Sequence, residues 1–164
     1  MAEVAQVIIL GIDPGTTHCG FAVIRDGVCI THGRISGVGS HARHRRIRVI
    51  GTGLRGVVER YAPDVVAMEM PFVNAKRLNN AIPMGEARGV ATLVTDPLVV
   101  FDYSPSEVKQ AATGKGNAKK DDVRRGVSRL FGLDVDTVTE DGADALAVAW
   151  LHWTRMRSAK KETA

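Results

Sequence analysis

The order of strand and helix patterns is the feature that most restricts what this chain can fold into. Three strand-like segments come first, with Asp26-Gly27 as a tight turn between the second and the third, and the later strands alternate with helical patterns. Right-handed crossovers between the later strands predict an α/β fold, a mixed five-stranded sheet with helices on both faces. The expected strands are residues 6–12, 19–25, 28–35, 64–68 and 97–103.

Helical patterns lie between and after the later strands. The first contains an apolar stripe with a repeat of about 3.6 residues, including Ile47, Ile50 and Leu54, and Pro63 ends it. The second is expected to be interrupted by Pro83. The expected helices are residues 40–62, 76–94, 104–112, 117–131 and 139–157.

Length and composition fit one domain. A chain of 164 residues buries roughly two-thirds of its unfolded surface, so we expect a single domain over residues 1–157 and a disordered tail at 158–164. No apolar run is long enough to span a bilayer and the N-terminus lacks a signal-peptide pattern, which leads us to expect a cytoplasmic protein. Cys19 and Cys29 are expected to be buried thiols in a reducing compartment.

The positive charge is unevenly distributed along the chain. The net charge is +4, and basic residues cluster at 43–48, 109–129 and 155–161. Such clusters favour a polyanionic partner, although a run of arginines is also typical of a solvated helix face. In the first cluster we favour phosphate contact for Arg45 and Arg46, because the apolar stripe of that helix is otherwise regular.

Two carboxylates stand at the ends of expected strands. Asp13 follows the apolar run of the first strand, where Asp13-Pro14-Gly15 is also a good turn sequence in its own right. Glu69 ends a run of aliphatic residues at a position where another buried aliphatic residue is expected. A carboxylate there costs several kcal/mol unless it is paired, protonated or bound to metal. The ends of strands in open α/β sheets are also where ligands usually bind.

Two further carboxylates begin the last expected helix. Asp141 and Asp144 are three residues apart, which puts them on one face of that helix. Acids in a first turn also complement the helix dipole, but Asp144 is followed by an apolar segment. The four acids together form a set of oxygen ligands suited to Mg²⁺, and two such ions would support hydrolysis of a phosphodiester bond.

Lysines surround a glycine-containing loop before the fourth expected helix. Asn117 is a plausible N-cap, which places Lys119 and Lys120 in the first turn, and Gly114-Lys115-Gly116 precede it. Loop amides, a helix N-terminus and lysines form a suitable binding site for a phosphate group. Surface lysines at a solvated helix end are the alternative. The loop lacks the Gly-Lys-Ser/Thr signature of nucleotide-binding P-loops.

These motifs resemble those of one family, the RuvC family of bacterial Holliday-junction resolvases. They follow the family's order and cover about residues 7–153, with a departure at Met70-Pro71. Some members carry histidine at the position of Asp141. The matching motifs are Leu10-Gly11-Ile12-Asp13-Pro14-Gly15 with Gly20, Glu69-x-x-Phe72, Val108-Lys109, Gly114-x-Gly116-x-Ala118-x-Lys120 and Asp141-x-x-Asp144-Ala145-Leu146-Ala147.

The resemblance implies a ribonuclease H-like fold and a homodimer that nicks two opposed strands of a four-way DNA junction. It implies Mg²⁺, two ions per active site, or Mn²⁺ as the cofactor, and the branch-migration proteins RuvA and RuvB as partners. The implied metal ligands are Asp13, Glu69, Asp141 and Asp144. Phe72, which is otherwise typical of a core residue, is implied to face DNA, and Lys109 and Lys120 are the implied functional lysines.

Other functions remain open from the sequence alone. The Asp13 motif also resembles the phosphate-binding turn of actin-like and Hsp70-like ATPases, but those proteins clasp ATP between two such domains. An RNA-processing nuclease related to RuvC would share the same first motif. A junction-binding protein that does not cut is a third possibility, which the presence of all four acids disfavours.

Overall fold

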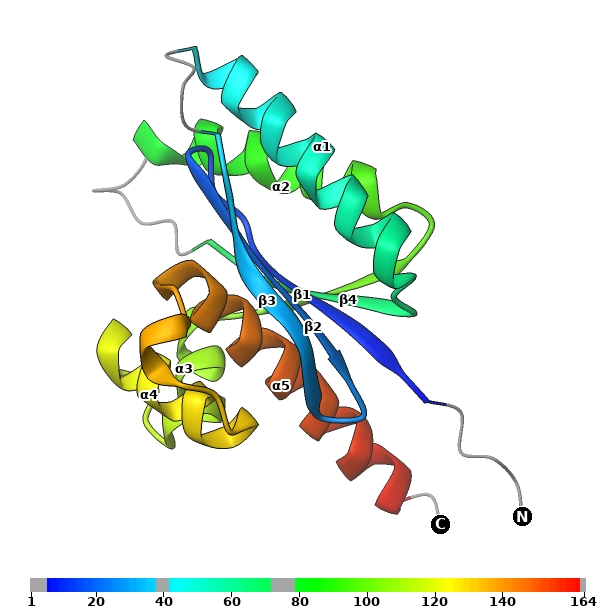
Figure 1. Ribbon diagram of the computed structural model, residues 1–164, viewed down its shortest axis with the longest axis vertical. Coiled ribbons are helices and arrows are strands. Elements are labelled where there is room, and N and C mark those ends of the chain that lie inside the picture. Colours follow the sequence, from blue (N-terminus) through cyan, green and yellow to red (C-terminus); the bar gives the residue numbers. More distant parts are fainter. Residues whose placement is uncertain (1–5, 38–41, 72–78, 163–164) are drawn as a thin grey trace.

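The expected mixed five-stranded sheet is confirmed. The computed structural model describes residues 6–37, 42–71 and 79–162 (Figure 1). The strand order is β3-β2-β1-β4-β5. Strand β2 is antiparallel to both β1 and β3, whereas β4 runs parallel to β1 and β5 runs parallel to β4. The strands are β1 (Ile8–Asp13), β2 (His18–Arg25), β3 (Val28–Ser36), β4 (Val65–Glu69) and β5 (Val99–Tyr103).

The hairpin between β2 and β3 has the expected turn. Arg25 pairs with Val28, which leaves Asp26 and Gly27 as a two-residue loop. Both loop residues have positive φ angles, 50° and 82° respectively. These angles match the right-handed twist of the strands, which explains the Asp-Gly sequence.

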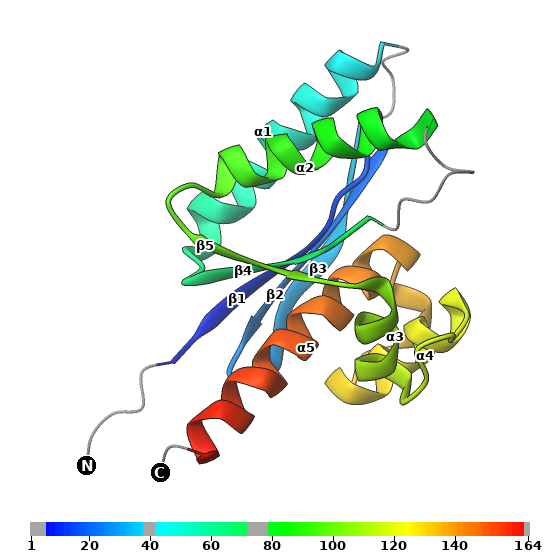
Figure 2. The same cartoon turned by 180° about the vertical axis from the view of Figure 1, so that it is seen from behind.

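Helices cover both faces of the sheet, as expected. Figures 1 and 2 show α1 and α2 on one face and α3, α4 and α5 on the other. Within the described residues, none of these helices combines the length and apolar character needed to cross a bilayer. The helices are α1 (Arg43–Tyr61), α2 (Ala81–Thr95), α3 (Pro105–Thr113), α4 (Lys120–Phe131) and α5 (Glu140–Glu162).

Several helix ends differ from the expected ones. Pro83 does not interrupt α2, because the helix begins at Ala81 and a first-turn residue needs no backbone donor. The last helix continues to Glu162, beyond the expected end at about residue 157. Its C-terminal part carries charged residues that lack an apolar periodicity, so the sequence pattern could not predict how far it extends.

Two apolar cores lie on the two faces of the sheet. One joins α3, α4 and α5 to the sheet, and its fully buried residues include Leu146 and Val148 of α5. The other joins α1 and α2 to the opposite face and includes Leu54 and Met68. Alternate residues of each central strand therefore face different helical layers.

Helix α5 lies very close to β1. A Cβ atom at Gly11 would collide with the backbone carbonyl of Ala145 and would lie 2.9 Å from the Cβ of Ala149. The small residues of α5 and the glycine of β1 together allow this separation. The start of α5 is thereby held against the end of β1.

We therefore expect Gly11→Ala to destabilise the fold by about 1–3 kcal/mol or more, because α5 must move away from the sheet to relieve the collision. Urea unfolding monitored by circular dichroism measures the change. Gly56→Ala is the matched control: Gly56 lies in α1 with no atom within 4 Å of an added Cβ. Alanine there should stabilise the protein by up to about 1 kcal/mol. Equal stabilities of the two variants would contradict this packing argument.

Candidate active site

Two of the predicted acids come from adjacent parallel strands. Asp13 and Glu69 are the last residues of β1 and β4, and their carboxyl ends meet at the same edge of the sheet. Ala67, two residues before Glu69, belongs to the α5-side core, whereas Met68 belongs to the α1–α2 core. Strand alternation therefore directs Glu69, and likewise Asp13, towards α5.

The third acid comes from the first turns of α5. The hydroxyl of Thr139 accepts a hydrogen bond of 3.1 Å from the backbone N–H of Gly142 and so caps the helix. Gly20 of β2 allows the start of α5 to approach, since a Cβ there would collide with the Asp141 carbonyl. This packing brings Asp144 to the ends of β1 and β4.

Asp13, Glu69 and Asp144 line one cavity of about 820 Å³. The predicted lysines Lys109 and Lys120 line the same cavity, so the structure brings together residues from two strands and three helices. The cavity also has lining residues that were not expected as site residues from the sequence: Thr16, Pro71, Asn80, Ala81, Pro83, Met84, Pro105 and Val123.

The three acids carry more negative charge than their surroundings balance. Burial, with a smaller contribution from Asp144, raises the pKa of Glu69 to about 7. Burial, with a smaller contribution from Asp141, raises the pKa of Asp144 to about 6. The pKa of Asp13 lies well above its usual range, first because of burial and then because of Asp144, Glu69 and Asp141. Lys109 and Lys120 oppose part of this shift in Glu69 and Asp144.

The position of Asp141 differs from that of the other three acids. Asp141 is not among the described residues that line the cavity. Its carboxylate lies 3.7 Å from the guanidinium of Arg34, on strand β3. Asp141 nevertheless contributes to the raised pKa of Asp13, which shows that its charge acts on the cavity.

The donor set suits a divalent cation, although the side chains are not arranged as a closed cage. Among the described residues, no three His, Cys, Asp or Glu side chains are close enough together to hold a metal ion as they stand. Three carboxyl groups with raised pKa values in one cavity are nevertheless an electrostatic arrangement that a bound cation would relieve. All of the donors are hard oxygens, which magnesium and manganese prefer.

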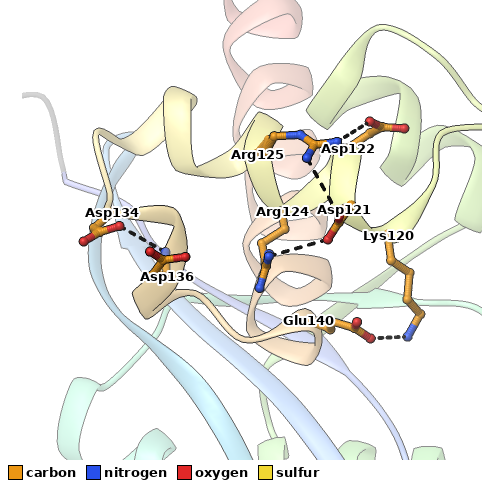
Figure 3. A network of polar contacts seen from close by, with 8 residues as sticks. All are labelled: Lys120, Asp121, Asp122, Arg124, Arg125, Asp134, Asp136 and Glu140. Carbon is orange, nitrogen blue, oxygen red and sulfur yellow. Dashed lines mark hydrogen bonds and ion pairs between the residues drawn. The ribbon is translucent and has the colours of Figure 1, made fainter.

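Lys120, which lines the cavity, pairs with an acid of α5. Its ammonium nitrogen donates a hydrogen bond of 3.1 Å to Glu140, the residue before Asp141 (Figure 3). This hydrogen bond raises the pKa of Lys120, with further contributions from Asp144 and Asp141. The lysine is therefore charged and close to the acids. The pairing joins the N-terminus of α4 to that of α5.

The expected N-cap of this helix was wrong. Helix α4 begins at Lys120 with Lys119 as its N-cap, not with Asn117. The side chain of Asp122 accepts a hydrogen bond of 3.2 Å from the backbone N–H of Lys119, so the capping group comes from inside the helix. Ala118, which is buried against the core, precedes the cap. Lys115 and Lys119 are both exposed, and Lys119 directly precedes the cavity-lining Lys120.

The remaining predicted DNA contacts are Arg45, Arg46 and Phe72, and the two arginines differ in exposure. Arg45 is exposed on α1, whereas Arg46 is half-buried and donates a hydrogen bond of 3.1 Å to the backbone carbonyl of Thr16. Arg46 therefore also connects α1 to the segment after β1. Phe72 lies outside the described residues.

With this geometry established, comparison with known proteins identifies the family. The model of the family "Crossover junction endodeoxyribonuclease RuvC" matches residues 9–152. The chain belongs to the RuvC family.

Individual relatives agree with this assignment. The RuvC protein of Moorella thermoacetica is 39 % identical over 96 % of this chain and 99 % of its own length. That of Caldicellulosiruptor saccharolyticus is 38 % identical over 88 % of this chain and 90 % of its own length.

Solved structures agree with the fold as well. Thermus thermophilus RuvC in complex with a Holliday junction substrate has a TM-score of 0.81 and 28 % identity, over 93 % of this chain and 96 % of that one. The yeast mitochondrial Holliday junction resolvase Ydc2 has a TM-score of 0.63 at 12 % identity, over 95 % of this chain and 86 % of that one, and shows likeness of fold alone. The ribonuclease H-like fold implied by the motifs is confirmed.

The raised pKa of Glu69 predicts how stability depends on pH when no metal is present. The folded protein binds more protons than the unfolded chain between pH values of about 4.5 and 7, so the free energy of unfolding should fall as the pH rises through this window. The share from Glu69 is on the order of 2–3 kcal/mol. Glu69→Gln should remove that share.

Urea unfolding in the presence of a chelator, at pH values from 4.5 to 8, measures the effect for both proteins. The comparison is the difference between wild type and Glu69→Gln at each pH, because the other acids titrate in both proteins. A difference that stays constant across the window would show that Glu69 is not held in a destabilising environment.

Proposed function

We propose that this chain resolves four-way DNA junctions by hydrolysing phosphodiester bonds in two opposed strands. The observation that carries the proposal is the cavity in which Asp13, Glu69 and Asp144 meet with Lys109 and Lys120 at its walls. The family to which the chain belongs is named for this activity. The relative from Thermus thermophilus was solved with a Holliday junction substrate.

A divalent metal ion fits the acids of the cavity. Asp13, Glu69 and Asp144 would hold it, and Asp141 would support the site through its charge on Asp13. We favour two Mg²⁺ ions, with Mn²⁺ as a substitute. When bound, they supply Lewis-acid stabilisation of the attacking and leaving oxygens of the phosphodiester.

The lysines supply positive charge to the same site. Lys120 lines the cavity, and there it stabilises the negative charge that grows on the scissile phosphate. Lys109 lines the same cavity, and among the described residues it forms no ion pair that would neutralise it. It can therefore bind a neighbouring phosphate.

The remaining contacts would hold the DNA outside the cavity. Lys115, Lys119 and Arg45 are exposed and can contact phosphates of the junction arms. Arg46 is a proposed DNA contact because of the positive charge of the first helix. Phe72 is a proposed DNA contact because of the resemblance to the family. A homodimer would present two cavities, one for each nicked strand, and RuvA and RuvB are the proposed protein partners.

One comparison of substrates tests the proposal. The protein is incubated with a four-way junction, a linear duplex of the same sequence and a structured RNA, each with Mg²⁺ or with a chelator. We expect paired nicks in the junction only, and only with Mg²⁺. Cleavage of RNA alone would favour an RNA-processing nuclease, and binding of the junction without nicks would favour a protein that only binds.

The acids should be necessary for cutting but not for binding. We expect Asp13→Asn, Glu69→Gln and Asp144→Asn each to abolish cleavage, with junction affinity largely kept, because each removes metal-binding charge and little surface. Asp141→Asn should have the smallest effect of the four, since Asp141 pairs with Arg34. Cleavage gels and fluorescence anisotropy measure the two properties. A cavity acid whose variant cuts normally does not belong to the site.

Lys120 should act on the rate more than on binding. Removing one preorganised donor costs about 10²–10³ in rate, so we expect a loss of that size for Lys120→Ala in single-turnover cleavage of pre-bound junction. Lys119→Ala is the control, with an effect mainly on affinity. The double variant Lys120→Ala/Glu140→Gln should lose as much rate as Lys120→Ala, because the ammonium rather than the freed carboxylate is responsible. A normal rate for Lys120→Ala on bound junction would leave Lys120 a DNA-binding residue only.

A further inference from the structure

Arg88 connects helix α2 to the strand that carries Glu69. One guanidinium nitrogen of Arg88 donates a hydrogen bond of 3.0 Å to the backbone carbonyl of Glu69. The other donates a hydrogen bond of 2.7 Å to the carboxylate of Asp102, on the neighbouring strand β5. Only 20 % of the Arg88 side chain is exposed, so the arginine is enclosed while it makes both contacts. A single side chain thus spans the ends of two strands.

The contact is made on the face of the sheet covered by α1 and α2, opposite to the face covered by α5. Phe101 and Tyr103 of β5 both pack against His152 of α5, so Asp102 between them is directed to the other face, where α2 lies (Figure 2). Glu69 directs its side chain to the α5 side. Arg88 therefore holds the main chain of Glu69 from behind.

The main chain of Glu69 lies where the sheet ladder stops. Met70 donates a backbone hydrogen bond of 2.7 Å to the carbonyl of Tyr103, and Pro71, which follows, has no N–H to donate. The Glu69 carboxylate is meanwhile partly buried and repelled by Asp144, and both effects raise its pKa. A strand end under this repulsion needs support besides the ladder. Arg88 and Asp102 are placed to give it, because charge-assisted hydrogen bonds are among the stronger ones.

We propose that Arg88 and Asp102 are positioning residues that fix the main chain of Glu69, so that its carboxylate is preorganised to bind a divalent cation. This proposal rests on the proposed metal-dependent function of the cavity. Arg88 touches neither the metal ion nor the DNA in this role, and it acts through Glu69. Residues that orient a metal ligand from behind typically change metal affinity about 10- to 100-fold when they are replaced.

The alternative is that Arg88 and Asp102 only join α2 to β5 and contribute to stability. Both roles predict a lower melting temperature when the pair is broken, so stability cannot separate them. Metal affinity can, when it is measured well below the melting temperature of every variant. Glu86 supplies a matched control, because it forms a comparable ion pair of 2.6 Å from the same helix, but to Arg43 on α1.

The experiment measures Mn²⁺ binding to the full chain without DNA, by titration calorimetry or by electron paramagnetic resonance of free Mn²⁺. We expect Arg88→Met to weaken Mn²⁺ binding at least 10-fold, and Asp102→Asn to weaken it less, because the bond from Arg88 to Glu69 remains. Arg88→Lys should recover part of the loss, since one ammonium can still bond the Glu69 carbonyl. Glu86→Gln should bind Mn²⁺ as the wild type does.

Cleavage provides a second readout with the same variants. Single-turnover rates on pre-bound junction should fall for Arg88→Met while junction affinity stays within about twofold, and higher Mn²⁺ concentrations should restore part of the rate. A role in stability alone would leave the rate on bound junction unchanged. If Arg88→Met does not fold, Asp102→Asn and Arg88→Lys decide the question by the same comparison with Glu86→Gln.

Glu69→Gln separates failure of this proposal from failure of the proposed function. If Mn²⁺ binding is weakened in Glu69→Gln but normal in Arg88→Met, the positioning role is overturned and the metal site stays in place. If Arg88→Met is unfolded, normal Mn²⁺ binding in both Asp102→Asn and Arg88→Lys has the same meaning. Mn²⁺ binding that is normal in Glu69→Gln overturns the metal site itself, and the positioning role with it.

Discussion

The close contact between α5 and strands β1 and β2 is the constraint on which the site depends. Gly11 and Gly20 leave no room for a Cβ atom, because the carbonyls of Ala145 and Asp141 occupy that space. A helix further from the sheet would place Asp144 further from Asp13 and Glu69. The two glycines therefore set the distance between acids that come from opposite ends of the chain, and the cavity exists because this distance is short.

The short distance between the acids is electrostatically unfavourable. Burial and mutual repulsion raise the pKa values of Asp13, Glu69 and Asp144, so the free site stores unfavourable free energy that a cation would release. The surrounding fold must resist this repulsion. On one side the N-terminal half of α5 is anchored by buried residues, and on the other the end of β4 is tied to α2. The contacts that hold the acids in place are thus made by the packing of α5 and by the tie between β4 and α2, and not by the acids themselves.

Much of this architecture could be predicted from the sequence, for identifiable reasons. The strands showed apolar runs of the right length, the Asp26-Gly27 turn has one usual conformation, and Glu69 stood out as an acid in an apolar run. The pairs that link distant elements could not be predicted. Arg34 with Asp141, Arg88 with Asp102 and Lys120 with Glu140 depend on which elements pack together, and no local spacing reveals that. The start of α4 was missed because its capping group, Asp122, lies inside the helix.

The charges of α4 show how the positive potential is concentrated near the cavity. Asp121 pairs with Arg124 and Arg125, and Asp122 pairs with Arg125, so these two arginines are paired with acids of their own helix (Figure 3). Lys120 turns away from these acids and bonds Glu140 at the start of α5. The lysine can exchange that exposed partner for a phosphate at little cost, because an exposed ion pair contributes little to stability. In helix α4, Arg124 and Arg125 therefore pair with acids of the same helix, whereas Lys120 at its start lines the cavity.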